Sequence, residues 1–283
     1  MKNAATLAAL VMVSALSNPA AAQATTDSLV EVDTGRTQGV FTKTPVFIRA
    51  ILARPAHPTD TALLYFRGAP GYARITSTDD KMRNAGSILR PNLQLLAREG
   101  ITLVVMDCPT DQWGGPADAI PANCLDDYRS SQAHADDVRG IMARLRGEYG
   151  LTRFYIMGHS AGTLSTRWLA KNLGNEIAGS IHSATLTLPN SRGFGASLAG
   201  FRFDTIAAPV LQVHHENDAC SYSPYAAVQA YAGGSLITVR GGSGAGDPCG
   251  AGHYHSYQGR EAAVVKAIVD WIRTGRVERT VGE

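Results

Sequence analysis

Short apolar runs alternate with longer amphipathic stretches along the chain from about residue 61 onward. The apolar runs have the length of strands, and near-continuous ones such as ITLVVM at 101–106 indicate burial on both faces of a sheet. Apolar strands that alternate with helical stretches predict βαβ units on a mostly parallel sheet. The expected strands are residues 61–68, 101–107, 153–159, 177–185, 208–216 and 235–241.

Helical periodicity fills the intervals between these runs and returns after the last one. The stretch from Leu29 to Ala53 has no helical period, and its Val, Phe and Ile content predicts an antiparallel pair of strands. The sequence GGSGAGDPCGAG at 241–252 holds too many glycines for a helix or a strand, so it predicts a loop before the last helix. The expected helices are residues 87–98, 128–147, 161–173, 224–232 and 260–274.

Composition and charge narrow the class of protein. Of the 283 residues, 45% are hydrophobic and 18% are charged, which is typical of a folded globular chain. Lys plus Arg is 26 and Asp plus Glu is 24, so the net charge of +2 provides no field that would attract nucleic acid. The length fits one large domain or two small ones, and we expect a single α/β domain over residues 25–283.

The first 24 residues have the three regions of a secretory signal peptide. A cation at Lys2 precedes an apolar run from Ala4 to Leu16, and small residues follow. That run is about 13 residues long, shorter than the roughly 20 that a retained membrane anchor needs. We therefore expect cleavage after Ala22 or Ala24, export to the periplasm or the medium, and no membrane partner afterwards.

Export changes the interpretation of the four cysteines. Cys108, Cys124, Cys220 and Cys249 form an even set in a chain expected in an oxidising compartment, which favours two disulfides over free thiols. Four cysteines allow three pairings, and the sequence alone does not choose among them. We expect the neighbours to pair, Cys108 with Cys124 and Cys220 with Cys249. A zinc site is the alternative, but the chain contains no Cys-x-x-Cys pair.

The junction between the expected strand 153–159 and the following helix reads Gly-His-Ser-Ala-Gly, with Ser160 at its centre. This is the G-x-S-x-G pattern in the strand-to-helix context that gives it meaning. Small residues at Gly158, Ala161 and Gly162 allow a tight turn, and the helix N-terminus directs its N–H groups to where an oxyanion would form. Ser160 is therefore the candidate nucleophile.

A serine hydroxyl needs a base within hydrogen-bond reach and an acid that orients the base. In proteins with this motif the acid and then the His come later in the chain than the serine. Asp218 and Glu216 both follow the buried strand 208–216, and we favour Asp218 because it stands deeper in the loop. His253 and His255 both precede the last helix, and physical reasoning leaves the choice between them open.

GHSAG, the strand ending in HHEND, and HYHSYQGREAAVVKAIVDWI before a closing helix together resemble the α/β-hydrolase superfamily, from about Leu63 to Ile272. The resemblance implies the α/β-hydrolase fold, favours Asp218 over Glu216, and assigns the base to His255. His255 is the histidine that matches a closing pattern seen in exported bacterial hydrolases, in which a small residue, an aromatic residue, Gly and Glu follow at fixed offsets.

The resemblance also identifies YFRGAPG at 65–71 as an oxyanion loop, with Arg67 where the family commonly has His. The oxyanion donors would then be the backbone amides of Ala69 and Ala161. A disulfide between Cys220 and Cys249 would join the loops of the acid and the base, because disulfide geometry requires Cα atoms within about 7 Å. If these cysteines were far apart, at least one of the two loops would be misplaced.

The implied activity is that of an exported serine hydrolase that cleaves carboxylic esters or other small acyl substrates, with no metal or organic cofactor. Only about 22 residues separate strands 177–185 and 208–216, too few for a large cap, so an open cleft bordered by Phe194, Trp113 and Tyr72 is expected.

A peptidase or amidase of the same fold and a catalytically silent binding protein are the alternatives. A metal site is disfavoured, because His214 and His215 are adjacent strand residues that point to opposite faces. The oligomeric state is left open.

Overall fold

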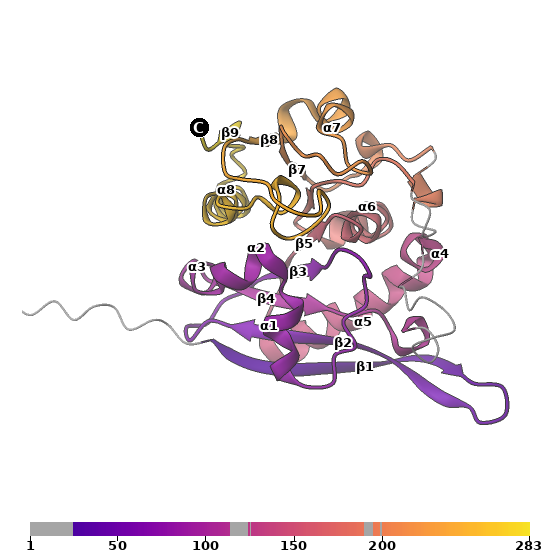
Figure 1. Ribbon diagram of the computed structural model, residues 1–283. Coiled ribbons are helices and arrows are strands. Elements are labelled where there is room, and N and C mark those ends of the chain that lie inside the picture. Colours follow the sequence, from indigo (N-terminus) through magenta and orange to yellow (C-terminus); the bar gives the residue numbers. More distant parts are fainter. Residues whose placement is uncertain (1–24, 114–123, 125, 190–194, 199) are drawn as a thin grey trace, which may run out of the picture.

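The computed structural model describes residues 25–113, 124, 126–189, 195–198 and 200–283. The expected signal peptide therefore lies outside the described residues. The described chain contains a nine-stranded sheet in the order β1-β2-β4-β3-β5-β6-β7-β8-β9 (Figure 1). Its strands are β1 Thr26–Gln38, β2 Thr44–Arg54, β3 Thr61–Phe66, β4 Ile101–Met106, β5 Arg153–His159, β6 Gly179–Ser183, β7 Val210–His215, β8 Leu236–Val239 and β9 Thr280–Val281.

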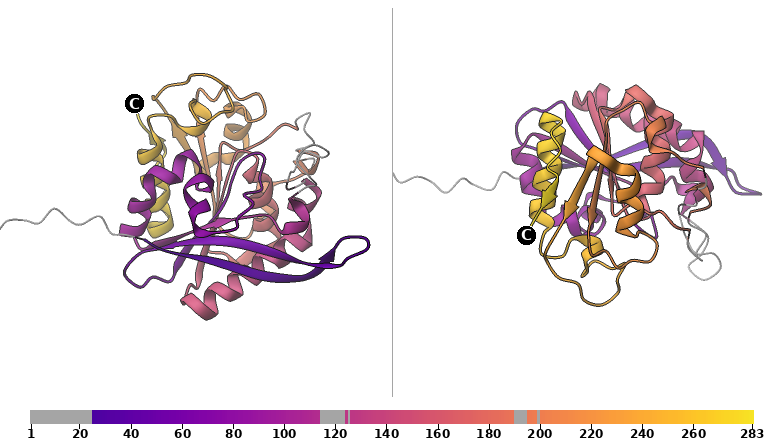
Figure 2. Two further views of the ribbon diagram at one scale, coloured as in Figure 1. Left: turned by 60° about the horizontal axis from the view of Figure 1, so that its bottom comes forward. Right: turned by 90° about the horizontal axis from the view of Figure 1, so that it is seen from above.

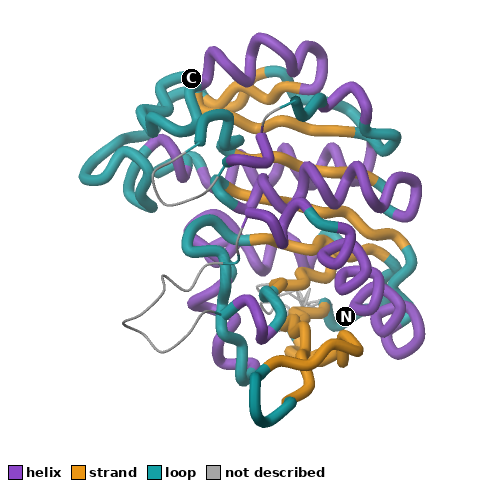
Figure 3. The backbone as a smooth tube through the Cα atoms, turned by 90° about the vertical axis from the view of Figure 1, so that its right-hand side faces the viewer, coloured by secondary structure: helices purple, strands orange, loops and turns teal. Residues whose placement is uncertain are grey.

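The first two strands form a hairpin, and β2 pairs antiparallel with β4, whereas every pair from β4 through β3 to β9 is parallel. Helices cover both faces of this sheet, as Figures 2 and 3 show. The helices are α1 Lys81–Asn84, α2 Gly86–Leu89, α3 Leu93–Arg98, α4 Asp126–Ser130, α5 Gln132–Tyr149, α6 Gly162–Leu173, α7 Tyr225–Ala232 and α8 Glu261–Thr274.

Two hydrophobic cores lie on opposite faces of the sheet. On one face, α2, α3 and α8 pack through side chains such as Ile88, Leu96 and Ile268. On the other face, α5 and α6 pack through side chains such as Ile141 and Leu169. The central strands β3 and β4 are buried at every position because they contribute to both cores, which is why they have no polar alternation.

The predicted sheet is confirmed, including the antiparallel pair at the start, and every expected strand lies within three residues of an observed one. Two expected helices are interrupted. Pro91 divides residues 87–98 into α2 and α3, because proline has no N–H for the helical ladder. Ser131 is extended and accepts a hydrogen bond from the His134 amide, so it ends α4 and caps α5. The short β9 was not expected.

The segment between β6 and β7, residues 184–209, contains two short 3₁₀ turns among its described residues and no inserted helical cap. None of the described helices combines the length and the apolar character needed to cross a membrane. Because the parallel strands share one direction, the loops after β3, β5, β7 and β8 meet at one edge of the sheet. All the candidate catalytic residues lie on those loops.

Candidate active site

Ser160 lies in the turn between β5 and α6, with a positive φ of 53°. Such a conformation is rare for a residue with a Cβ and is typical of strained functional turns. The turn is tight enough to require glycine on both sides. A Cβ on Gly158 would lie 2.5 Å from the Gly162 carbonyl oxygen, and one on Gly162 would lie 2.0 Å from the Phe66 carbonyl oxygen. The Gly residues of the motif therefore allow the nucleophile turn to pack against the end of β3.

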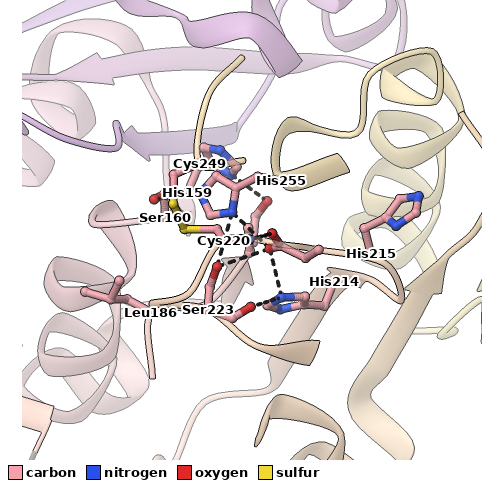
Figure 4. Close-up of polar contacts among 12 residues, drawn as sticks. His159, Ser160, Leu186, His214, His215, Cys220, Ser223, Cys249 and His255 are labelled. Atoms are coloured by element: carbon pink, nitrogen blue, oxygen red, sulfur yellow. Dashed lines mark hydrogen bonds and ion pairs between the residues drawn. A yellow bond between two sulfur atoms is a disulfide. The ribbon is translucent and has the colours of Figure 1, made fainter. Parts of the chain in front are cut away.

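His255 lies in a short 3₁₀ turn, Tyr254–Ser256, on the long loop between β8 and α8. Its Nε2 is 2.9 Å from the Ser160 Oγ, and its Nδ1 is 2.9 Å from the Asp218 Oδ2 (Figure 4). The imidazole is 1% exposed. The structure thus brings together, in one line of hydrogen bonds, the three side chains that the sequence nominated as nucleophile, base and acid.

Asp218 follows β7, and its carboxylate accepts several hydrogen bonds. Oδ1 accepts from the Cys220 amide at 2.9 Å, and Oδ2 accepts from the Ser223 hydroxyl at 3.1 Å. The Nε2 of His214 is 3.1 Å from Oδ2 and 2.8 Å from the carbonyl oxygen of Ser223. Burial by itself would raise the pKa of Asp218, but the hydrogen bonds from His214 and His255 outweigh it and hold the pKa below its usual range. The carboxylate is therefore ionised at neutral pH.

The two rival residues lie away from this line. Glu216 forms a surface ion pair with Arg240, Oε2 to Nε, at 2.9 Å. His253 packs its ring against Tyr254, and its buried Nδ1 has no hydrogen-bond partner among the described residues. Neither side chain contacts Ser160 in the described structure. The geometry accordingly brings Asp218 and His255 to the serine and leaves Glu216 and His253 outside.

A second layer of side chains supports the loop of His255. Tyr257, at a φ of 59°, donates a hydrogen bond from its hydroxyl to the Val213 carbonyl at 2.7 Å and accepts one from the Ala184 amide at 3.0 Å. The same hydroxyl is 2.9 Å from the hydroxyl of Ser183. These contacts fix the loop two residues after His255 to the ends of β6 and β7.

His159, at the first variable position of the G-x-S-x-G turn, packs against the ring of the base. Its ring centroid is 5.3 Å from that of His255, and its Nδ1 is 3.1 Å from the Ser183 hydroxyl. Burial, with a smaller contribution from the nearby His255, lowers the pKa of His159 to about 3. His159 is therefore neutral at physiological pH and adds no competing charge beside the base.

The expected oxyanion loop follows β3. Asp107, at the end of β4, accepts hydrogen bonds from the Ala73 and Ile75 amides at 2.7 Å each and so holds the loop in place. Ala69 and Ala161 line the same cleft as Ser160. Among the described residues, no hydrogen-bond acceptor contacts the backbone N–H of either alanine. Both N–H groups are consequently available to an oxygen bound beside the serine.

The cleft around Ser160 has a volume of about 770 Å³, within the usual range for small-molecule sites. The expectation that Trp113 and Tyr72 border it is wrong. Trp113 donates its indole N–H to a carbonyl of its own loop, and the Tyr72 ring packs under Arg74, so both lie outside the described wall. Leu186 and Tyr222 supply the apolar wall instead, while Phe194 lies outside the described residues.

Both disulfides have the expected pairing, Cys108 with Cys124 and Cys220 with Cys249. The second bond lines the cleft and holds its two Cα atoms 4.6 Å apart. It joins the loop of Asp218 directly to the loop of His255. Two such bonds are typical of exported proteins.

Three contributors were missed in the sequence: His214, Ser223 and Tyr257 as supports of the acid and base. His214 was considered only as a metal ligand, and the family pattern marked an aromatic residue at 257 without giving its role. Their roles depend on contacts between loops far apart in the chain, for which the sequence has no local signal. Within the described residues, no group of three or more His, Cys, Asp or Glu side chains could hold a metal ion.

The sheet order, the strained serine turn after β5 and the helices on both faces define an α/β-hydrolase fold. No protein-family model and no curated protein matches the sequence. Comparison with solved structures supports the α/β-hydrolase fold.

Three similar structures illustrate the likeness. Est1E from Butyrivibrio proteoclasticus is 15% identical, with 81% of this chain and 94% of that chain covered and a TM-score of 0.53. A dienelactone hydrolase-like promiscuous phosphotriesterase from metagenomic libraries is 15% identical, with coverages of 88% and 98% and a TM-score of 0.54. An acylaminoacyl peptidase from Pyrococcus horikoshii is 13% identical, with coverages of 89% and 41% and a TM-score of 0.55. At these identities the likeness establishes the fold alone.

Proposed function

We propose that the protein is an exported serine hydrolase that cleaves carboxylic esters or related small acyl substrates through an acyl-enzyme intermediate. The observation that carries the proposal is the line of contacts from the Ser160 Oγ through His255 to the Asp218 carboxylate, with 2.9 Å at each step. Three side chains from three separate loops adopt the arrangement that activates a serine. A silent binding protein would have no need of all three.

The chemistry follows from the geometry. Ser160 Oγ attacks the ester carbonyl carbon while its proton passes to Nε2 of His255, and the tetrahedral intermediate forms. The intermediate breaks its bond to the alcohol oxygen, which leaves with the proton from Nε2. A water molecule then attacks the acyl-enzyme, gives a proton to His255, and releases the acid as the proton returns to Ser160.

Asp218 and the backbone amides stabilise the charges that this sequence creates. The ionised carboxylate fixes the imidazole with Nδ1–H toward it and stabilises the imidazolium. The N–H groups of Ala69 and Ala161 would hold the oxyanion, and each such donor contributes about 2.7–4 kcal/mol to the transition state. No step needs a metal or an organic cofactor.

The cleft favours small acyl substrates. Its volume of about 770 Å³ suits a ligand of drug size or less, and the β6–β7 segment carries no inserted helical cap in its described part. The fold similarity to an acylaminoacyl peptidase keeps amide cleavage as the second candidate, because the same three side chains serve both reactions.

Hydrolysis of p-nitrophenyl esters of increasing chain length, compared with amino-acid p-nitroanilides, tests the proposal. We expect turnover of short esters, little turnover of anilides, and a loss of roughly 10⁶-fold in kcat for Ser160→Ala. A Ser160→Ala variant as active as the natural protein would overturn the assignment. Faster cleavage of anilides than of esters would replace the esterase with a peptidase.

A further inference from the structure

The wall of the cleft formed by the end of β3 contains a positive charge that the triad chemistry does not use. Arg67 lines the cleft beside Gly68 and Ala69. Its Nη1 donates a hydrogen bond to the Oδ1 of Asn84 at 2.7 Å and lies 3.5 Å from the Tyr72 carbonyl oxygen. The Asn84 side chain is fully buried and is itself held by a hydrogen bond from its Nδ2 to the Asp80 carbonyl at 2.9 Å. The guanidinium is thus clamped at one nitrogen by a rigid neutral group.

The opposite edge of the same guanidinium carries no partner. Across the described part of the chain, neither Nε nor Nη2 of Arg67 forms a hydrogen bond, and no carboxylate pairs with this side chain. Nε and Nη2 form the side-on fork that matches the two oxygens of a carboxylate. Because Arg67 lines the cleft and this fork is unpaired, the side chain can bind an anion there.

A second donor lies in the same wall. The Tyr65 side chain is 99% buried and lines the cleft, yet its hydroxyl has no hydrogen-bond partner among the described residues. Gly86 leaves the space beside this hydroxyl open, since a Cβ there would approach the hydroxyl oxygen to 2.7 Å. Burial raises the pKa of Tyr65 to about 12, so the hydroxyl keeps its proton and can donate.

We propose that Arg67 and Tyr65 form a subsite that binds a carboxylate carried by the substrate, so that the preferred substrates are anionic esters. The inference rests on the proposed hydrolase function and specifies its substrate class. A planar two-oxygen anion uses both donors of the fork, whereas a neutral alkyl chain leaves the fork unpaired in a partly desolvated wall.

A second charged side chain in the cleft wall also supports this proposal. Asp247 also lines the cleft, on the loop after β8, and its Oδ1 accepts a hydrogen bond from the Cys249 amide at 3.0 Å. This carboxylate repels an anionic group placed near the β8–α8 loop. An anionic ester is therefore oriented with its charge toward the β3 end of the cleft, where Arg67 lies.

The test compares charged and neutral esters in the natural protein and in Arg67→Gln. Two pairs place the charge on either side of the scissile bond: p-nitrophenyl hydrogen glutarate against p-nitrophenyl hexanoate, and p-acetoxybenzoate against p-tolyl acetate. In at least one pair we expect the ratio of kcat/KM, anionic over neutral, to fall about tenfold or more in Arg67→Gln, mainly through KM. Arg67→Lys should keep part of the ratio, because it retains the charge and loses the fork.

Arg74→Gln is the matched control, since it removes the same charge from an exposed arginine outside the described cleft wall. It should leave both ratios unchanged. Ratios that fall equally in Arg74→Gln, or that do not change in Arg67→Gln for either pair, would overturn the subsite.

Calorimetric titration of the Ser160→Ala variant with glutarate gives a readout that does not depend on turnover. We expect binding that weakens about tenfold when Arg67→Gln is added. Arg67-dependent binding without ester turnover in the natural protein would reject the hydrolase proposal and keep an anion site. Ester turnover together with glutarate binding that does not depend on Arg67 would reject the anion subsite and keep the hydrolase proposal.

Discussion

The loops that carry Asp218 and His255 meet at the same serine but are fixed by different kinds of contact. The acid loop, residues 216–224, is short, and apart from the contact with His255 the hydrogen bonds of Asp218 are local: its amide donates to the His215 carbonyl and its carboxylate accepts from the Ser223 hydroxyl. The base loop, residues 240–260, is long and glycine-rich. Its anchors reach segments distant in the chain: the Tyr257 hydroxyl donates to the Val213 carbonyl, and Cys249 forms a disulfide with Cys220 of the acid loop.

This difference shows which contacts position the acid and which position the base. The acid is held by its own strand and turn, so its position follows once β7 joins the sheet. The base stands in a single 3₁₀ turn, closed by the Tyr257 amide on the Tyr254 carbonyl, within a long glycine-rich loop whose backbone has high conformational freedom. That turn is held against the sheet by the long-range links of Tyr257 and Cys249. We therefore expect changes to remote anchors to impair the base more than the acid.

The largest expected effects come from removing the two groups themselves. His255→Ala should lower kcat by roughly 10⁶-fold, and Asp218→Asn by roughly 10⁴-fold, because the base itself transfers the proton, whereas the acid orients the imidazole and stabilises its charge. Steady-state kinetics on a p-nitrophenyl ester checks both values. An Asp218→Asn variant that is impaired more than His255→Ala would contradict the assigned roles.

The two disulfides offer the next comparison. Removing either by paired Cys→Ser changes should lower the unfolding free energy by about 3 kcal/mol, since their sequence separations of 16 and 29 are similar on a logarithmic scale. Only loss of the Cys220–Cys249 bond should also lower kcat, by about tenfold or more, because it frees the base loop. Denaturant unfolding and kinetics on both paired variants give the answer. Equal kcat values in the two would show that the bond does not position the base.

Much of this architecture could be predicted from the sequence, because it depends on local pattern. The strands follow from apolar periodicity, and Ser160 follows from a turn that needs glycine at fixed offsets. The choice between His253 and His255 could not be made from physical reasoning, since both are near the same glycines. The support from Tyr257 depends on loops joined only in the folded chain. Pro91 breaks the helix expected over residues 87–98, and this break is a local signal that the sequence does contain.

Tyr257→Phe tests the remote anchor of the base loop with a smaller change. It deletes one hydroxyl and leaves the Val213 carbonyl and the Ala184 amide without their buried partner. We expect a loss of about 1–3 kcal/mol in unfolding free energy and a kcat reduced several-fold. His214→Phe, which keeps a ring and removes a hydrogen bond local to the acid, is the matched variant and should reduce kcat less. A larger loss of kcat in the acid-loop variant than in Tyr257→Phe would contradict the claim that remote anchors matter more for the base.

The smallest predicted effect at neutral pH concerns the protonation of His159, whose ring packs against that of the base. Its folded pKa of about 3 lies below the unfolded value of about 6.5, so between these values the unfolded state binds a proton that the folded state does not. Stability is therefore retained above pH of about 6.5 and falls, as the pH decreases, by up to about 1.4 kcal/mol per unit.

His159→Gln should make that dependence shallower by the same amount. Urea unfolding at several pH values between about 4 and 7 measures the slope in both proteins. An unchanged slope would mean that His159 titrates normally in the folded state, which its burial against His255 and Ser183 opposes.

Labelling with a fluorophosphonate probe, followed by peptide mass mapping, tests the central claim most directly. The reagent reacts covalently with a serine only when a base has activated it, so it reports the contact between Ser160 and His255 without knowledge of the natural substrate. We predict a single phosphonyl adduct on Ser160, absent from Ser160→Ala and strongly reduced in His255→Ala. Label on another residue, or none on folded protein, would contradict the account.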